Sequence, residues 1–183
     1  MRAAPFLLLT AACGIGLNPG ETGGMDAGPV DGGPEEQVWL DAQNAVRRAA
    51  QPAPNPPLPP LTWSADAAAV AQAWADNCNY AHNAGRGMRG ENIAATAPPG
   101  QWNSTGVVGL WAGEMQSYDY ASNTCASDQQ CGHYTQIVWR TTARAGCAHR
   151  TCAINSPLAM NPTWDFWVCD YEPPGNYVFQ KPY

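Results

Sequence analysis

The stretch Cys131-Gly132-His133-Tyr134-Thr135-Gln136-Ile137-Val138-Trp139 decides how the rest of this chain is interpreted. An imidazole follows a Cys-Gly pair, and the stretch closes on an apolar run. The pattern predicts a short helical turn around His133, entered directly from a loop between Cys125 and Cys131. His133 is a candidate site residue, because the sequence contains only three histidines.

The segments around this stretch predict a mixed fold. Phe166-Trp167-Val168-Cys169-Asp170-Tyr171-Glu172-Pro173-Pro174-Gly175-Asn176-Tyr177 begins with the aromatic and β-branched content of a strand, expected over 164–171. The proline-rich segment Gln51–Pro60 excludes helix, and Gly85–Gly90 is expected to be a loop. The other expected elements are helices over 36–50 and 105–118, an alanine-rich helix capped by Ser64 that presents Val70, Trp74 and Cys78 on one face, and a strand over 141–152. Helices first and strands last predict an α+β fold.

The distribution of charged residues limits the kinds of molecule that this chain can bind. The chain has 183 residues and a net charge of −6, but five of its 15 acidic residues lie within the first 36 positions. Residues 37–183 are nearly neutral, and their arginines form no cluster larger than Arg47–Arg48. A protein that binds a phosphate backbone needs a basic stripe, so nucleic acid is excluded as a partner.

The N-terminus predicts export. Met1–Arg2 is positive, Ala3–Ala12 is apolar, and Cys13 follows two alanines, as in a signal peptide that ends in a lipobox. We expect residues 1–13 to be this signal and Cys13 to be lipidated; plain secretion, with Cys13 lost in the cleaved piece, is the alternative. Residues 14–36, rich in glycine, proline and acid, are expected to form a disordered tether. Six cysteines then remain for disulfides in an oxidising compartment.

Two carboxylates and two imidazoles are candidates for a site. At 100° per residue, Glu114 falls in the middle of an apolar helical stripe, where a carboxylate is costly unless it is paired or faces a polar cleft. Glu91 lies in a Gly-Glu-Asn loop, where capping of nearby amides is the alternative role. His82 and His133 with these acids are suitable ligands for a zinc-like ion, although no tight ligand spacing supports it. His149, among arginines on an expected strand, is predicted to be solvated.

The motifs together resemble the CAP superfamily of cysteine-rich secretory, antigen 5 and pathogenesis-related group-one proteins. Besides the two stretches quoted above, Gly90-Glu91-Asn92-Ile93 and Leu61-Thr62-Trp63 carry the resemblance, which covers residues 37–183. Ser122–Cys125 and the final Pro182-Tyr183 are similar to plant pathogenesis-related group-one proteins. The sequence departs from the family at Gln43, where a histidine is usual, and at Asp170, where a neutral polar or basic residue is usual. We expect little consequence of either for the site.

The resemblance implies a disulfide-stapled, three-layer α-β-α sandwich with a central, mostly antiparallel sheet. It also implies that His82, Glu91, Glu114 and His133 converge in a central cavity, where the histidines bind zinc in some relatives. The implied disulfides are Cys78–Cys152, Cys125–Cys131 and Cys147–Cys169. No cofactor is required, and Zn²⁺ is the one the cavity would take.

The resemblance also suggests hypotheses about the function. Relatives bind sterols at the loop equivalent to Thr124–Cys131 and fatty acids in a groove between two helices. The leading hypothesis is therefore an extracellular, monomeric lipid- or sterol-binding module of the defence type, attached to a membrane only through its lipid anchor. A metal-assisted hydrolase with Glu91 or Glu114 as general base is the alternative. Two further hypotheses are a precursor that releases Pro173–Tyr183 as a signalling peptide, and a structural module without a ligand.

Overall fold

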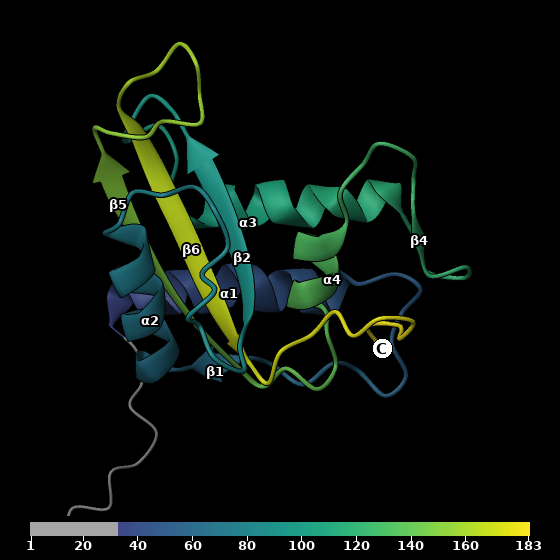
Figure 1. Ribbon diagram of the computed structural model, residues 1–183. Helices are drawn as coiled ribbons and strands as arrows, with labels where there is room; N and C mark the ends of the chain where they lie inside the picture. Colours follow the sequence, from purple (N-terminus) through teal and green to yellow (C-terminus); the bar gives the residue numbers. More distant parts are fainter. Residues whose placement is uncertain (1–32) are drawn as a thin grey trace, which may run out of the picture.

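The computed structural model describes residues 33–183 (Figure 1). The expected signal peptide, the lipidation site Cys13 and the tether up to residue 32 lie outside the described residues. The first helix begins at Pro34, so the last three residues assigned to the tether are helical.

Helices and strands follow one another in a mixed order. The elements are α1 (Pro34–Ala49), β1 (Thr62–Trp63), α2 (Ala65–Ala75), β2 (Gly90–Thr96), α3 (Ser104–Gly113) with a 3₁₀ turn over Glu114–Ser117, β3 (Tyr118–Asp119), β4 (Thr124–Cys125), α4 (Gly132–Ile137), β5 (Arg144–Cys152) and β6 (Trp164–Glu172). In the main sheet the strand order is β1-β5-β6-β2, and only the β1–β5 pair is parallel. Strands β3 and β4 form a separate two-stranded ribbon.

Helices cover both faces of the main sheet, as Figure 1 shows. On one face, α2 packs against Ile93, Phe166 and Val168. On the other, α1, α3 and α4 enclose a core that includes Trp39, Trp111 and residues of β5 and β6. The predicted α+β, three-layer sandwich with a mostly antiparallel sheet is confirmed. None of the helices within residues 33–183 has the length and apolar character needed to cross a membrane.

The buried face of α2 differs from the prediction. Ser64 caps the helix as expected, accepting a hydrogen bond from the backbone N–H of Ala67 at 3.2 Å. The fully buried helical residues, however, are Ala67, Ala71 and Ala75, and not the predicted larger residues Val70 and Trp74. The reason lies in the sheet: a Cβ atom at Gly146 would lie 2.1 Å from the backbone nitrogen of Ala68. Helix and strand approach so closely that only small residues fit between them.

Strand β2 is the main element that the sequence did not predict. Glu91 was assigned to a loop, but Gly90–Thr96 pairs along its whole length with β6. Its glycine and alanines have low intrinsic β-propensity, so the strand owes its formation to pairing with the buried β6. The third helix was also predicted too long, since it ends at Gly113 and gives way to the 3₁₀ turn.

The three disulfides are those implied by the family resemblance. Cys78–Cys152 ties the segment after α2 to the end of β5, and Cys147–Cys169 joins β5 to β6. Cys125–Cys131 connects β4 to the residue that precedes α4. The last of these closes the loop from which the chain enters the candidate site.

Candidate functional site

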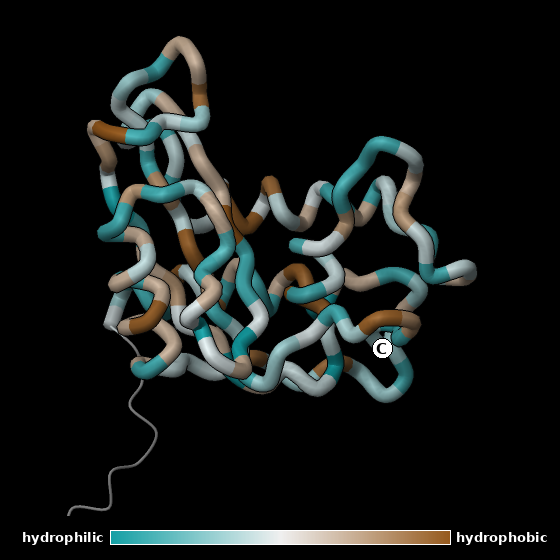
Figure 2. Tube along the Cα trace, in the orientation of Figure 1, coloured by the Kyte–Doolittle hydropathy of each residue, from teal (hydrophilic) through white to brown (hydrophobic). Residues whose placement is uncertain are grey.

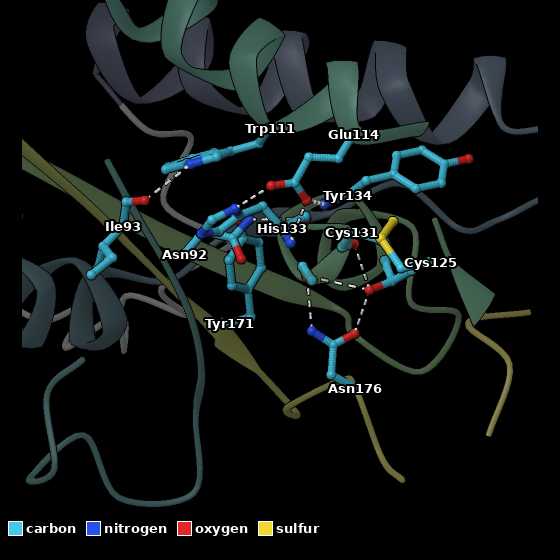
Figure 3. Close-up of polar contacts among 12 residues, drawn as sticks. Asn92, Ile93, Trp111, Glu114, Cys125, Cys131, His133, Tyr134, Tyr171 and Asn176 are labelled. Carbon is cyan, nitrogen blue, oxygen red and sulfur yellow. Dashed lines mark hydrogen bonds and ion pairs between the residues drawn. A yellow bond between two sulfur atoms is a disulfide. The ribbon is translucent and has the colours of Figure 1, made fainter. Parts of the chain in front are cut away.

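Glu114 and His133 form the better enclosed half of the site (Figure 3). Glu114 Oε1 lies 2.6 Å from His133 Nδ1. The other oxygen, Oε2, accepts hydrogen bonds from the backbone N–H groups of His133 at 2.9 Å and Tyr134 at 3.1 Å. One carboxylate therefore holds the imidazole and also satisfies two free amides in the first turn of α4.

Trp111 completes this half of the site. Its indole stacks on the His133 ring with centroids 6.0 Å apart, and its Nε1–H donates to the carbonyl of Ile93 in β2. The predicted inward position of Glu114 is confirmed, since its side chain is only 14% exposed. Leu110, which the predicted apolar stripe also includes, is instead 45% exposed, because the buried face of α3 is formed by Ser104, Val107, Val108 and Trp111.

His82 and Glu91 form the more open half. Glu91 Oε1 lies 2.7 Å from His82 Nδ1 and also accepts from the backbone N–H of Asn83 at 2.9 Å. The two partners differ strongly in exposure: the side chain of His82 is 56% exposed and that of Glu91 only 1%. The acid is thus part of the protein interior, and the imidazole lies at the surface above it.

Both halves border one polar cavity of about 310 Å³. It is lined by His82, Glu91, Gln130, Cys131, Gly132, His133 and Asn176. The structure therefore brings together three of the four predicted cavity residues, while Glu114 lies behind His133 as its hydrogen-bond partner. His149 is elsewhere: it stacks on Trp167 with ring centroids 4.5 Å apart, so the prediction of a solvated side chain is only partly right.

Asparagines hold the walls of the cavity in place, and no role was predicted for them. Asn92 Nδ2 donates to the carbonyl of His133 at 3.0 Å and to the hydroxyl of Tyr171 at 3.2 Å. Asn176 Nδ2 donates to the carbonyl of Gly132 at 2.8 Å (Figure 3). Both asparagines belong to the quoted family motifs, but their neighbours in the sequence contain no signal of these long-range contacts.

Two imidazole nitrogens of the cavity remain available to a metal ion. Each imidazole has its Nδ1 engaged by a carboxylate, which leaves Nε2 as the available ligand atom. Within residues 33–183 no group of three or more His, Cys, Asp or Glu side chains is arranged to hold a metal. His82 and His133 would thus supply two nitrogen ligands, with water completing the coordination.

A second cavity of about 310 Å³ also borders the Cys131-Gly132 segment. Cys131, Gly132 and Asn176 belong to the walls of both cavities. The aromatic side chains here come from distant segments: Tyr118, Trp139, Tyr177 and Phe179. The loop 126–130 has no aromatic residue of its own, so this apolar wall was not predictable from the loop sequence.

Comparison with known proteins identifies the family. The sequence model described as "Cysteine-rich secretory protein family", or CAP, matches residues 40–171. The chain belongs to the CAP family. Membership of a family of secretory proteins agrees with the three disulfides, which persist in oxidising compartments outside the cytosol.

Plant defence proteins are among the relatives of this CAP domain. Pathogenesis-related protein 1A1 of Solanum lycopersicum is 44% identical over 76% of this chain and 72% of its own length. The basic form of pathogenesis-related protein 1 of Nicotiana tabacum is 39% identical over 80% and 75%. Among solved structures, "NaASP2 with Zn2+" matches with a TM-score of 0.63, 21% identity and coverage of 81% of this chain and 84% of that one, which supports the fold.

Proposed function

We propose that this CAP-domain protein is a secreted, defence-type binding module, and that its polar cavity binds a divalent metal ion through Nε2 of His82 and His133. The observation that carries the proposal is the matched pair of Nδ1–carboxylate contacts, 2.7 Å for His82 and 2.6 Å for His133. A carboxylate behind each imidazole fixes its tautomer and the orientation of its ring.

Zinc is the ion of choice because imidazole nitrogen is a preferred zinc ligand and tetrahedral zinc accepts water in open positions. A solved structure with the same fold and 21% identity is that of "NaASP2 with Zn2+". With only two protein ligands, binding would be weaker than in a structural zinc site with four. We therefore expect an exchangeable ion and no dependence of folding on zinc.

The test is calorimetric titration of the oxidised protein with zinc, together with native mass spectrometry of the loaded form. We expect one ion per chain, lost in the double variant His82→Ala/His133→Ala. His149→Ala is the matched control, since this third histidine lies outside the cavity and pairs only loosely with Glu35 at 3.9 Å. Zinc binding that survives the double variant would refute the proposed ligands.

The geometry is less suited to the alternative function, a metal-assisted hydrolase. A general base needs a carboxylate oxygen that can reach a water molecule in the cavity. Both oxygens of Glu114 already accept hydrogen bonds, and Oε1 of Glu91 accepts two while its Oε2 is buried. Neither acid has a free oxygen directed at solvent, which favours binding over turnover.

Lipid binding is supported by a different region, the second cavity and the segment beside it. Val178 is 77% exposed and Phe179 is 98% exposed, next to the aromatic wall formed in part by Trp139 and Tyr177. Figure 2 shows this apolar stretch near the C-terminus. A sterol or fatty acid would enter the cavity that Cys125, Cys131 and this segment line, in keeping with the leading hypothesis from the sequence.

Vesicle flotation tests the lipid hypothesis. Vesicles of phosphatidylcholine with and without sterol should bind the wild type more than Phe179→Ser. Met160→Ser is the control, because Met160 is equally exposed, at 90%, on the β5–β6 loop away from the cavity. Equal flotation of both variants and the wild type would show that this region does not recognise lipid.

The third hypothesis, release of a C-terminal signalling peptide, is opposed by contacts of the tail. The carbonyl of Pro182 accepts a hydrogen bond from Arg140 N at 2.7 Å, and the hydroxyl of Tyr183 donates to the carbonyl of Gln51 at 3.0 Å. The ring of Tyr183 also stacks on that of Tyr120, with centroids 4.6 Å apart. These contacts favour a structural role for the tail.

A further inference from the structure

Two carboxylic acids lie directly opposite each other in the sheet. Glu91 of β2 pairs with Asp170 of β6 in the antiparallel register. Residues paired in this way share one face of the sheet, with Cβ atoms about 5 Å apart. Asp170 is 0% exposed and the Glu91 side chain 1% exposed, so water does not screen the pair. Two negative charges in this position would destabilise the sheet.

Three of the four carboxyl oxygens in this pair have no hydrogen-bond partner. They are Glu91 Oε2 and both oxygens of Asp170. The fourth, Glu91 Oε1, accepts from His82 Nδ1 and from Asn83 N. Glu91 therefore has hydrogen-bond donors at one of its oxygens, whereas Asp170 has none at either.

The surrounding arginines do not neutralise Asp170 by direct contact. Arg89 donates through Nε to Glu172 at 2.7 Å, and Arg86 donates through Nε and Nη1 to backbone carbonyls. The charged groups that act on Asp170 are thus these two guanidinium groups, which already donate hydrogen bonds to other partners, and two acids, Glu91 and Glu172. An isolated charge on Asp170 would be buried and unpaired.

We propose that Asp170 is a neutral acid in the folded protein at mildly acidic pH, and that it donates its proton to Oε2 of Glu91. The pair then carries a single negative charge, located on Glu91. Burial, reinforced by the charge on Glu91, raises the pKa of Asp170 to about 7, which agrees with this arrangement. The hydrogen bond gives partners to two of the three unsatisfied oxygens.

The consequence concerns His82. With Oε2 bonded to Asp170 and Oε1 bonded to His82 and Asn83, the Glu91 carboxylate has one orientation, and the Nδ1–H tautomer of His82 is favoured. Asp170 is therefore a positioning residue that acts on His82 through Glu91. This deepens the proposed function, because His82 is one of the two proposed metal ligands, but it requires no metal for its test.

Infrared difference spectroscopy at pH 6 tests the proton directly. The wild type should show the carbonyl stretch of a protonated carboxylic acid, and Asp170→Asn should lack it. Asp165→Asn is the matched control: Asp165 is also buried in β6, but its oxygens accept from Gly100 N at 2.8 Å and from Thr151 Oγ1 at 2.6 Å. That variant should keep the band. Absence of the band from the wild type, or its persistence in Asp170→Asn, would overturn the assignment.

Nitrogen NMR of His82 tests the positioning role. We expect the Nδ1–H tautomer to dominate in the wild type and in Asp170→Asn, whose amide can donate to Glu91 in place of the acid. In Asp170→Ala the donor is lost, and the tautomer ratio should fall by about threefold or more, as for loss of one buried hydrogen bond. An unchanged ratio in Asp170→Ala would refute positioning.

The two proposals fail separately. If zinc does not bind but the infrared band and the tautomer follow the expected pattern, the metal function is wrong and the role of Asp170 stands. If zinc binds through both histidines and the band is absent, the metal function stands and the role of Asp170 is wrong.

Discussion

The two His–Glu pairs of the cavity have nearly the same Nδ1–carboxylate distance, but different parts of the structure hold them in place. Glu114 binds an imidazole and two backbone amides of α4, and both partners of the pair are largely enclosed. Glu91 binds an imidazole and one amide of a loop, and its histidine is more than half exposed. One pair is thus part of the secondary structure, and the other joins a buried strand to the surface.

The difference shows that similar ligand geometry can rest on different structural supports. The position of His133 depends on the start of a helix, on the Cys125–Cys131 disulfide and on stacking against Trp111. The position of His82 depends on the carboxylate of Glu91, which lies opposite Asp170. We therefore expect perturbations of the two pairs to differ in size and in pH dependence.

The largest expected effect is the pH dependence of the Glu91 side. Because burial raises the pKa of Asp170 from 3.8 to about 7, the folded state holds a proton that the unfolded state releases above pH 4. This group's contribution to stability is complete below pH 4, falls as pH rises to 7, and is constant above. Between pH 4 and pH 7 the contribution of Asp170 to the free energy of unfolding therefore falls by about 4 kcal/mol, at 1.36 kcal/mol per pKa unit.

Urea denaturation of the wild type and Asp170→Asn between pH 4 and 8 measures this contribution. The free-energy difference between the two proteins should change with pH in favour of the variant, since the amide cannot ionise. Parallel stability curves would contradict a raised pKa. Asp165→Asn provides the control for loss of a buried carboxyl group in the same strand.

Replacing either glutamate with alanine should have a smaller effect on the free energy of unfolding. Glu114→Ala removes three hydrogen bonds, two of them to the first turn of α4, and should lower the free energy of unfolding by about 3 kcal/mol. Glu91→Ala should cost only about 1 kcal/mol, because the structure gives Glu91 two hydrogen bonds in place of three, and one of them joins the exposed ring of His82. Denaturant midpoints at pH 7 measure both. Equal losses would mean that the supports are equivalent.

The disulfide that supports His133 gives the next test. Cys125→Ser/Cys131→Ser removes the bridge that closes a short loop, and should cost roughly 2 kcal/mol by the chain-entropy relation. The NMR signals of the His133 ring should shift, whereas those of His82 should stay in place. A comparable shift at His82 would show that the two halves of the cavity are coupled.

The smallest expected effect comes from removing the imidazoles themselves. His133→Ala loses the stacking on Trp111 and the bond to Glu114, and should cost about 1 kcal/mol. His82→Ala should stay within about 0.5 kcal/mol, as for most exposed positions. Thermal unfolding of both variants checks the order, and a larger loss for His82 would reverse the comparison.

The fold class was predicted correctly, whereas two features of the packing around the candidate site were not. His82, Glu91 and His133 border one cavity and Glu114 faces inward, as the family motifs implied. The alanine face of α2 and the strand β2 were missed. Both depend on a partner distant in sequence: α2 requires a glycine in β5, and β2 requires the buried strand β6.

Asp170 illustrates the same limit. In the sequence it is a departure from the family pattern of expected minor effect, and its strand neighbours do not distinguish it from an ordinary polar substitution. Only the register between β2 and β6 places it opposite Glu91, where burial changes the favoured charge state of its carboxyl group.

The sequence by itself determined the family, the helical turn at His133 and the capping role of Ser64, because these follow from short motifs and local hydrogen bonding. The tertiary structure decided which residues of α2 are buried, how each histidine is supported, which aromatic side chains border the second cavity, and which acid lies beside Glu91. These properties depend on close packing and on water exclusion between segments far apart in the chain, and no local pattern of residues records them.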